Sequence, residues 1–112
     1  MADCLFCRII RREIPAQIVQ EDEHALVFRD IQPQAPTHVL VIPKKHFGSL
    51  LDTSDADAVL LGRLQAAARR FAAEAGLSSF RLVANNGRGA GQSVDHLHYH
   101  LLAGRAMQWP PG

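Results

Sequence analysis

The sequence carries almost no excess charge, because 12 Lys and Arg residues stand against 11 Asp and Glu residues, for a net charge of +1. Such a balance gives no electrostatic reason to expect a large nucleic-acid-binding surface. The chain also lacks an apolar run of membrane-spanning length. Its first residues, MADCLFCRII, lack the basic lead and long apolar run of a secretory signal. We therefore expect a cytoplasmic protein that binds neither nucleic acid nor membranes.

Internal repeats, linkers and low-complexity segments are missing as well, so nothing in the sequence divides the chain. Its 112 residues suit one domain, 1–112, with one core. Apolar residues make up 47% and charged residues 21%, which are ordinary values for a globular domain.

Cysteine is scarce, with two residues in the spacing CLFC, Cys4 and Cys7. In a reducing compartment such a pair more often binds metal or acts in redox chemistry than forms a structural disulfide. A third interpretation is that two small, half-buried residues begin a helix. The spacing alone leaves all three open.

The hydrophobic pattern predicts two helices. Apolar residues recur at helical spacing in CLFCRIIRREI, which predicts a short helix that Pro15 ends. A longer helix follows Thr53 or Ser54, either of which can cap it, and Gly76 is placed to stop it. Its apolar stripe consists of Leu60, Leu64, Ala67, Phe71 and Ala75.

Five segments predict strands, because they are apolar or β-branched and lie between turn-forming residues. They are residues 17–21, 24–30, 37–43, 80–85 and 95–104. Short connections favour antiparallel pairing. We therefore expect the α+β class, with about five strands and with the helices packed on one face of the sheet.

Three histidines alternate with apolar residues in DHLHYHLLAG: His96, His98 and His100. On a strand, alternate residues share a face, so the three imidazoles project together, roughly 6–7 Å apart per pair. Three identical imidazoles are not a packing choice. The pattern indicates either a shared zinc ion or a nucleophilic imidazole that its neighbours orient.

A glycine-rich loop, NNGRGAGQS, leads into the histidines. Gly87, Gly89 and Gly91 allow positive φ angles and a close approach of the backbone to a ligand, and successive N–H groups in such a loop can bind an anion. Ser93 adds a hydroxyl. The loop alone is equally consistent with a flexible connection, but beside three histidines it suggests a bound phosphate.

The segment HLHYHLL resembles the defining motif of the histidine triad superfamily. CRIIRREIPA, RDIQPQAPTHVLVIPKKH, VANNGRGAGQSVDHLHYHLLAGR and the terminal WPPG resemble its histidine triad nucleotide-binding branch, in the same order and over nearly the whole chain. The resemblance implies a five-stranded antiparallel sheet with a short N-terminal helix and one long helix. It also implies a homodimer with a ten-stranded sheet, and hydrolysis of AMP joined to an amine by a purine nucleoside phosphoramidase.

The resemblance also assigns roles to residues. His98 would be the nucleophile, assisted by His96, His100 and Ser93. The nucleotide would be bound by Asp30, Ile31, Asn85, Gly91, Gln92, Ser93, His98 and His100. From the sequence alone, Asp30 is nearly as well explained as a turn-former before IQP. Ala90 stands where the family pattern leads us to expect a glycine.

Other branches of the superfamily carry a zinc ion, which here would be held by Cys4, Cys7, His46 and His96. Two thiolates and two imidazoles form a closed tetrahedral site, so this zinc would be structural, and catalysis would need no cofactor. The alternative is that His46 and His96 are metal-free groups around His98. His24 and His38 are interpreted as structural.

Other functions remain open at this stage. A dinucleoside polyphosphate hydrolase would form the same intermediate but release a nucleotide. A nucleotide-binding interaction protein with weak turnover would have the same sequence features. A zinc hydrolase with three histidine ligands is a further alternative. The terminal MQWPPG is either a disordered tail or, as the resemblance implies, a segment near the other subunit's active site.

Overall fold

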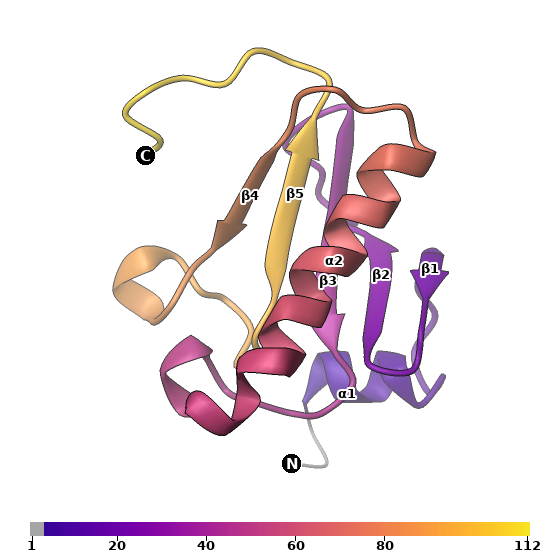
Figure 1. Ribbon diagram of the computed structural model, residues 1–112, viewed down its shortest axis with the longest axis vertical. Coiled ribbons are helices and arrows are strands. Elements are labelled where there is room, and N and C mark those ends of the chain that lie inside the picture. Colours follow the sequence, from indigo (N-terminus) through magenta and orange to yellow (C-terminus); the bar gives the residue numbers. More distant parts are fainter. Residues whose placement is uncertain (1–3) are drawn as a thin grey trace.

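The chain folds as a five-stranded antiparallel sheet with one helix on each face, as the computed structural model shows for residues 4–112 (Figure 1). The strand order is β1-β2-β3-β5-β4. The elements are α1 (Leu5–Ile10), β1 (Ile18–Glu21), β2 (Ala25–Arg29), β3 (Thr37–Pro43), α2 (Ala58–Glu74), β4 (Arg81–Ala84) and β5 (Tyr99–Ala103). Three short 3₁₀ turns lie at Leu50–Asp52, Asp55–Asp57 and Arg88–Ala90.

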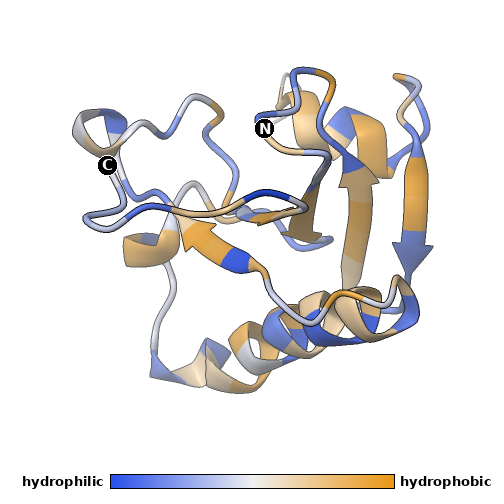
Figure 2. Cartoon of the chain, turned by 90° about the horizontal axis from the view of Figure 1, so that it is seen from above, coloured by the Kyte–Doolittle hydropathy of each residue, from blue (hydrophilic) through white to orange (hydrophobic). Residues whose placement is uncertain are grey.

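The two faces of the sheet form separate cores. Alternate residues of β2 and β3, such as Val27 and Val41, pack with α2, whereas the residues between them, such as Leu26 and Ile42, pack with α1. In Figure 2 the apolar strands lie between the two helices. The expectation that both helices cover one face is therefore wrong. The central strands are apolar on both faces, so each face needs its own cover.

The long helix begins later than its capping residue suggested. The Ser54 side chain accepts a hydrogen bond from the Ala56 N–H, and the Asp57 carboxylate accepts one from the Ser54 N–H. This capping box starts a 3₁₀ turn, however, and α2 follows at Ala58. The predicted stop is confirmed, because α2 ends at Glu74 and Gly76 has a φ of 71°.

The last strand begins at Tyr99, so His96 and His98 lie in an irregular segment before it and not on a strand from residue 95 as predicted. The alternation nevertheless persists, because Leu97, Tyr99 and Leu101 all pack into the core beneath α2. The Leu97 N–H donates to the carbonyl of Phe47 at 2.7 Å instead of joining a strand ladder. Packing of the apolar residues thus sets the pattern without regular strand geometry.

Among residues 4–112, no helix has the length and apolar character that crossing a lipid bilayer requires.

Candidate active site

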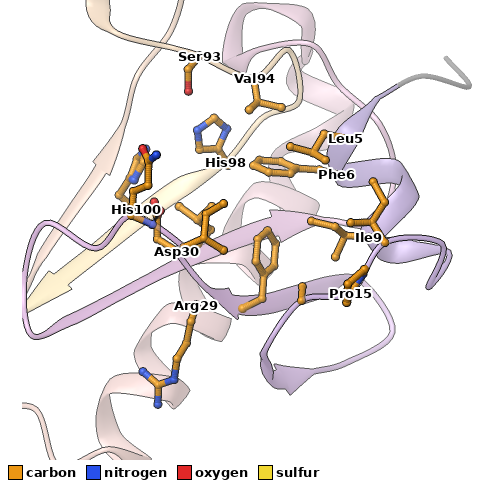
Figure 3. A pocket seen from close by; sticks show the side chains of 16 residues that line it. Leu5, Phe6, Ile9, Pro15, Arg29, Asp30, Ser93, Val94, His98 and His100 are labelled. Carbon is orange, nitrogen blue, oxygen red and sulfur yellow. Dashed lines mark hydrogen bonds between the residues drawn. The ribbon is translucent and has the colours of Figure 1, made fainter.

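A cavity of about 340 Å³ opens between α1, the end of β2 and the segment that carries the histidines (Figure 3). Its volume lies in the range of small-molecule sites. Its apolar wall includes Leu5, Phe6, Ile9, Ile14, Phe28, Ile31, Leu40 and Val94, and its polar groups include Asp30, Ser93, His98 and His100. The cavity therefore combines a broad apolar surface with a few polar side chains at one end.

His98 presents an unprotonated nitrogen in its neutral form. Its Nδ1 lies 2.7 Å from the carbonyl oxygen of His96, and a carbonyl only accepts, so Nδ1 carries the proton and donates it. The lone pair is then on Nε2. The side chain is 4% exposed and lines the cavity, so this nitrogen is held in one orientation beside the space that a ligand would fill.

His100 has the opposite proton arrangement, and His38 causes it. The Gln34 N–H donates to Nδ1 of His38 at 3.0 Å, so His38 carries its proton on Nε2. That N–H lies 2.9 Å from Nδ1 of His100 and 3.3 Å from Oδ2 of Asp30. His100 therefore accepts at Nδ1 and keeps its proton on Nε2, as a hydrogen-bond donor.

Burial keeps the imidazoles of His100 and His38 neutral by lowering their pKa values. It lowers the pKa of His100 to about 4, with smaller contributions from neighbouring His98 and His38. Burial also lowers the pKa of His38, although the carboxylate of Asp30 opposes this shift. We call Asp30, His38 and His100 the relay, and its two imidazole rings are uncharged near pH 7. His38, interpreted as structural from the sequence, therefore contacts a residue that lines the cavity.

Asp30 forms the turn that the sequence predicts before IQP, and it also lines the cavity. Its Oδ1 accepts the N–H of Gln32 at 2.8 Å, which is the turn expected before IQP. Its other oxygen faces His38, and the residue lines the cavity. The turn fixes the carboxylate at the cavity wall, next to Ile31, whose side chain is 93% exposed.

The glycine-rich loop is closed on itself, so most of its N–H groups over residues 87–92 are not free to bind an anion. The N–H groups of Ala90, Gly91 and Gln92 all bond to carbonyls within the loop. Gly87 and Gly91 have φ angles of 89° and 94°, whereas Gly89 has no positive φ. The structure also does not bring Asn85, Gly91 or Gln92 to the cavity wall.

The Gln92 side chain is buried and tied to three backbone groups. Its oxygen accepts the Gly87 N–H at 2.8 Å, and its nitrogen donates to the carbonyls of Gly48 at 2.7 Å and Val94 at 3.0 Å. Gln92 therefore holds the loop in place. The next two residues, Ser93 and Val94, do line the cavity, and the Ser93 hydroxyl has no hydrogen-bond partner among residues 4–112.

The four predicted zinc ligands come together behind the cavity, and we call them the thiol–histidine cluster: Cys4, Cys7, His46 and His96. Nδ1 of His96 lies 3.3 Å and 3.6 Å from the sulfurs of Cys4 and Cys7, and Nδ1 of His46 lies 3.3 Å from Cys7 and 3.0 Å from His96. Tetrahedral zinc at ordinary bond lengths separates such ligand atoms by roughly 3.3–3.8 Å.

Proton positions support the same donor set. Nε2 of His96 lies 2.9 Å from the carbonyl of Pro43 and must donate to it, so the lone pair of His96 is on Nδ1 and faces the two sulfurs. Metal-binding histidines usually show this arrangement. In the metal-free protein, burial lowers the pKa of His96 to about 4. The pKa of Cys7 is raised, mainly by burial and to a smaller extent by a hydrogen bond with Cys4.

A second group of potential ligands, Asp30, His38 and His100, fits a metal poorly. Nε2 of His38, which faces Asp30 and His100, carries a proton, because Nδ1 accepts a hydrogen bond from the Gln34 N–H. A protonated nitrogen cannot bind a metal ion. Nor do His96, His98 and His100 form a metal-binding group in the described part of the chain, so the alternative of a zinc hydrolase with three histidine ligands finds no support. His96 turns away from the cavity towards the cysteines.

The match with known proteins covers nearly the whole chain. A model of the HIT domain matches residues 11–107. The chain belongs to the HIT family. A HIT-like protein of Synechocystis, described as uncharacterised, is 53% identical over 98% of this chain and 97% of its own.

Solved HIT structures share the fold. A HIT family hydrolase from Legionella pneumophila is 53% identical, with a TM-score of 0.96 over 98% of this chain and 100% of its own. A histidine triad nucleotide-binding protein from Candida albicans is 34% identical, with a TM-score of 0.83 over 96% of this chain and 83% of its own. The fold of this HIT protein is thus that of proteins named as hydrolases.

Proposed function

We propose that this HIT protein is a purine nucleoside phosphoramidase, which cleaves the P–N bond between AMP and an amine through a covalent intermediate on His98. The observation that carries the proposal is the bond of 2.7 Å from Nδ1 of His98 to the His96 carbonyl. This bond leaves Nε2 unprotonated beside a cavity large enough for a nucleoside. A fixed, neutral imidazole is a good nucleophile near neutral pH.

In the first step, Nε2 of His98 attacks the α-phosphorus while the P–N bond breaks, and the amine leaves after taking up a proton. Ser93 is suited to direct that proton, because its hydroxyl lies at the cavity and has no other described partner. The Nε2–H of His100, fixed by the relay through His38, stabilises the charge on the phosphoryl oxygens.

In the second step, water attacks the same phosphorus and the bond to His98 breaks. AMP and a proton are released, and His98 returns to its neutral form. Two displacements in sequence replace one harder displacement. The apolar wall of the cavity would hold the purine, and the Asp30 carboxylate would accept hydrogen bonds from the ribose hydroxyls.

We further propose that the thiol–histidine cluster binds one structural zinc ion, which bridges α1 to the segment before β5. All four ligands are protein groups, so no position is left for substrate. The active form would be a homodimer, in which two sheets join into one of ten strands. β4 lies at an edge of the sheet, so its outer side is available for such pairing.

The deciding experiment is mass spectrometry after the protein is mixed with an AMP phosphoramidate and a metal chelator. We expect an AMP adduct on His98, with loss of the adduct and of turnover in His98→Ala. The matched control is His24→Ala, since His24 lies in a turn remote from the cavity and should keep both. A dinucleoside polyphosphate that is hydrolysed faster than the phosphoramidate would contradict the proposed substrate class.

A further inference from the structure

The thiol–histidine cluster contacts His98 through the backbone of one of its own members. The ring of His96 is held by the carbonyl of Pro43 and by the sulfurs of Cys4 and Cys7. The backbone carbonyl of His96 accepts a hydrogen bond from the ring Nδ1–H of His98. Rotation of the His96 backbone would take away the group that keeps the proton of His98 on Nδ1. The orientation of the nucleophile therefore depends on the anchoring of the His96 ring.

Phe6 provides a second contact. It lies between the two cysteines in the sequence, and its ring, 4% exposed, meets the ring of His98 edge-to-face at 5.2 Å and 87° (Figure 3). The same ring meets His96 at 5.8 Å and Phe28 at 5.4 Å. Phe6 therefore fills the space into which the ring of His98 could otherwise rotate.

The helix that carries Phe6 cannot hold this position by itself. α1 has six residues, and isolated helices of that length are not stable in water. Its first turn is capped by a sulfur, because the N–H of Cys7 donates to Sγ of Cys4 at 3.4 Å. The position of Phe6 thus depends on its packing against the sheet and on the same two cysteines that hold His96.

We propose that Phe6 and the carbonyl of His96 are positioning groups for His98, and that both lose their positions when Cys4 and Cys7 are oxidised to a disulfide. The proposed hydrolase would thus be active only with reduced cysteines. This inference rests on the proposed function for the role of His98 as nucleophile, but the coupling between the cysteines and His98 is a property of the fold.

The oxidation is chemically feasible with a peroxide as the oxidant. The ligand atoms of the cluster lie within 4.8 Å of one another, and cysteines three residues apart at a helix start can form a disulfide. Two thiols and one hydrogen peroxide give one S–S bond and two waters, as two electrons pass from the sulfurs to the O–O bond. A zinc ion bound there would leave with its charge unchanged.

A matched pair of variants tests the role of Phe6. Phe6→Leu removes the ring beside His98, and Phe71→Leu removes a similarly buried ring from the core on the α2 side. We expect kcat for an AMP phosphoramidate to fall about tenfold or more in Phe6→Leu, because small displacements of a reacting group are costly. ¹⁵N NMR of His98 should show a mixture of tautomers. Phe71→Leu should lower only the melting temperature, and equal effects of the two variants on kcat and on the His98 signals would overturn the role of Phe6.

Oxidation of the wild-type protein tests the control by cysteines, and does not depend on whether Phe6→Leu folds. One equivalent of hydrogen peroxide should remove two hydrogens by mass, release any bound zinc to a chromophoric chelator, and change kcat and the His98 ¹⁵N signals as Phe6→Leu does. Dithiothreitol with zinc should restore both, and Cys4→Ser/Cys7→Ser should not respond to peroxide. Full activity and unchanged His98 signals in fully oxidised protein would refute the proposal. If the reduced protein hydrolyses no phosphoramidate, the proposed function fails, while the His98 signals still test the coupling.

Discussion

At the scale of single residues, His38 decides which nitrogen of His100 carries a proton. His38→Leu removes the N–H that bonds Nδ1 of His100, whereas His38→Gln can keep an amide donor at a similar position. Because a general acid–base or hydrogen-bonding group in the wrong tautomer loses its function, we expect kcat to fall by about 10²-fold in His38→Leu. His38→Gln should retain more activity. Equal kcat in the two variants and the wild type would show that the relay has no catalytic role.

The low pKa of His100 predicts a loss of stability in acid. Its pKa is about 4 in the folded protein, against 6.5 for a free imidazole. Between pH 4 and pH 6.5, His100 is protonated in the unfolded chain but neutral in the folded protein. The contribution of His100 to the free energy of unfolding is therefore complete above pH 6.5 and is lost as the pH falls towards 4. Urea unfolding should show a lower midpoint at pH 5 than at pH 7. His100→Asn should reduce this difference, and an unchanged difference would assign the acid sensitivity to other groups.

At the scale of elements, the loop before the histidines depends on Gln92. Gln92→Leu keeps a similar volume but leaves the Gly87 N–H and the carbonyls of Gly48 and Val94 without their partner. Buried groups left unpaired cost about 1–3 kcal/mol, so the free energy of unfolding should fall by that amount. Gln17→Leu is the control, because the Gln17 side chain is exposed, and it should have little effect in the same urea titration. Similar unfolding free energies for the two variants would show that the Gln92 side chain does not hold the loop in place.

The short helix α1 is the element that zinc should stabilise. A ligand that binds only the folded protein raises stability by mass action, by about 4 kcal/mol at a concentration 1,000 times its Kd. We expect equimolar zinc to raise the melting temperature by several degrees and a chelator to reverse the change. Zinc should also slow the exchange of backbone amide hydrogens, mainly in α1. Cys4→Ser/Cys7→Ser should not respond to zinc. A zinc-dependent melting temperature in that double variant would place the metal elsewhere.

The elements were largely predictable from the sequence, but the contacts between them were not. Apolar alternation at Leu97, Tyr99 and Leu101 predicted the face shared by the histidines, because the same burial operates with or without a regular strand. The role of His38 depends on the register of β3 against β5, in which Leu40 lies opposite His100. Register is set by packing of whole strands, so a single sequence does not show it. The ring nitrogens that carry protons likewise depend on backbone groups distant in sequence.

At the scale of the whole molecule, the two cores explain how one small domain separates chemistry from support. The core under α2 is hydrophobic, whereas the face under α1 carries the cavity and borders the thiol–histidine cluster. The family motif predicted the fold and the members of that cluster. It did not predict that a hydrogen bond from His98 would join the nucleophile to the cluster, since this bond runs through the backbone of His96.

The C-terminal segment supplies the last prediction, which concerns the dimer. Within its own chain the tail is fixed by the bond from Arg81 to the carbonyl of Gln108 at 2.9 Å, while the Trp109 side chain beyond it is 82% exposed. A Trp with so much apolar surface in solvent is expected to find a partner, and in the proposed dimer that partner is the other subunit's active site. Deletion of residues 109–112 should therefore shift the ratio of kcat/KM between two AMP phosphoramidates with different amines by about tenfold, which corresponds to roughly 1.4 kcal/mol. Light scattering should still give twice the 12.3 kDa chain mass, and the melting temperature should change little. An unchanged ratio in a truncated protein that remains dimeric would exclude the tail from substrate selection.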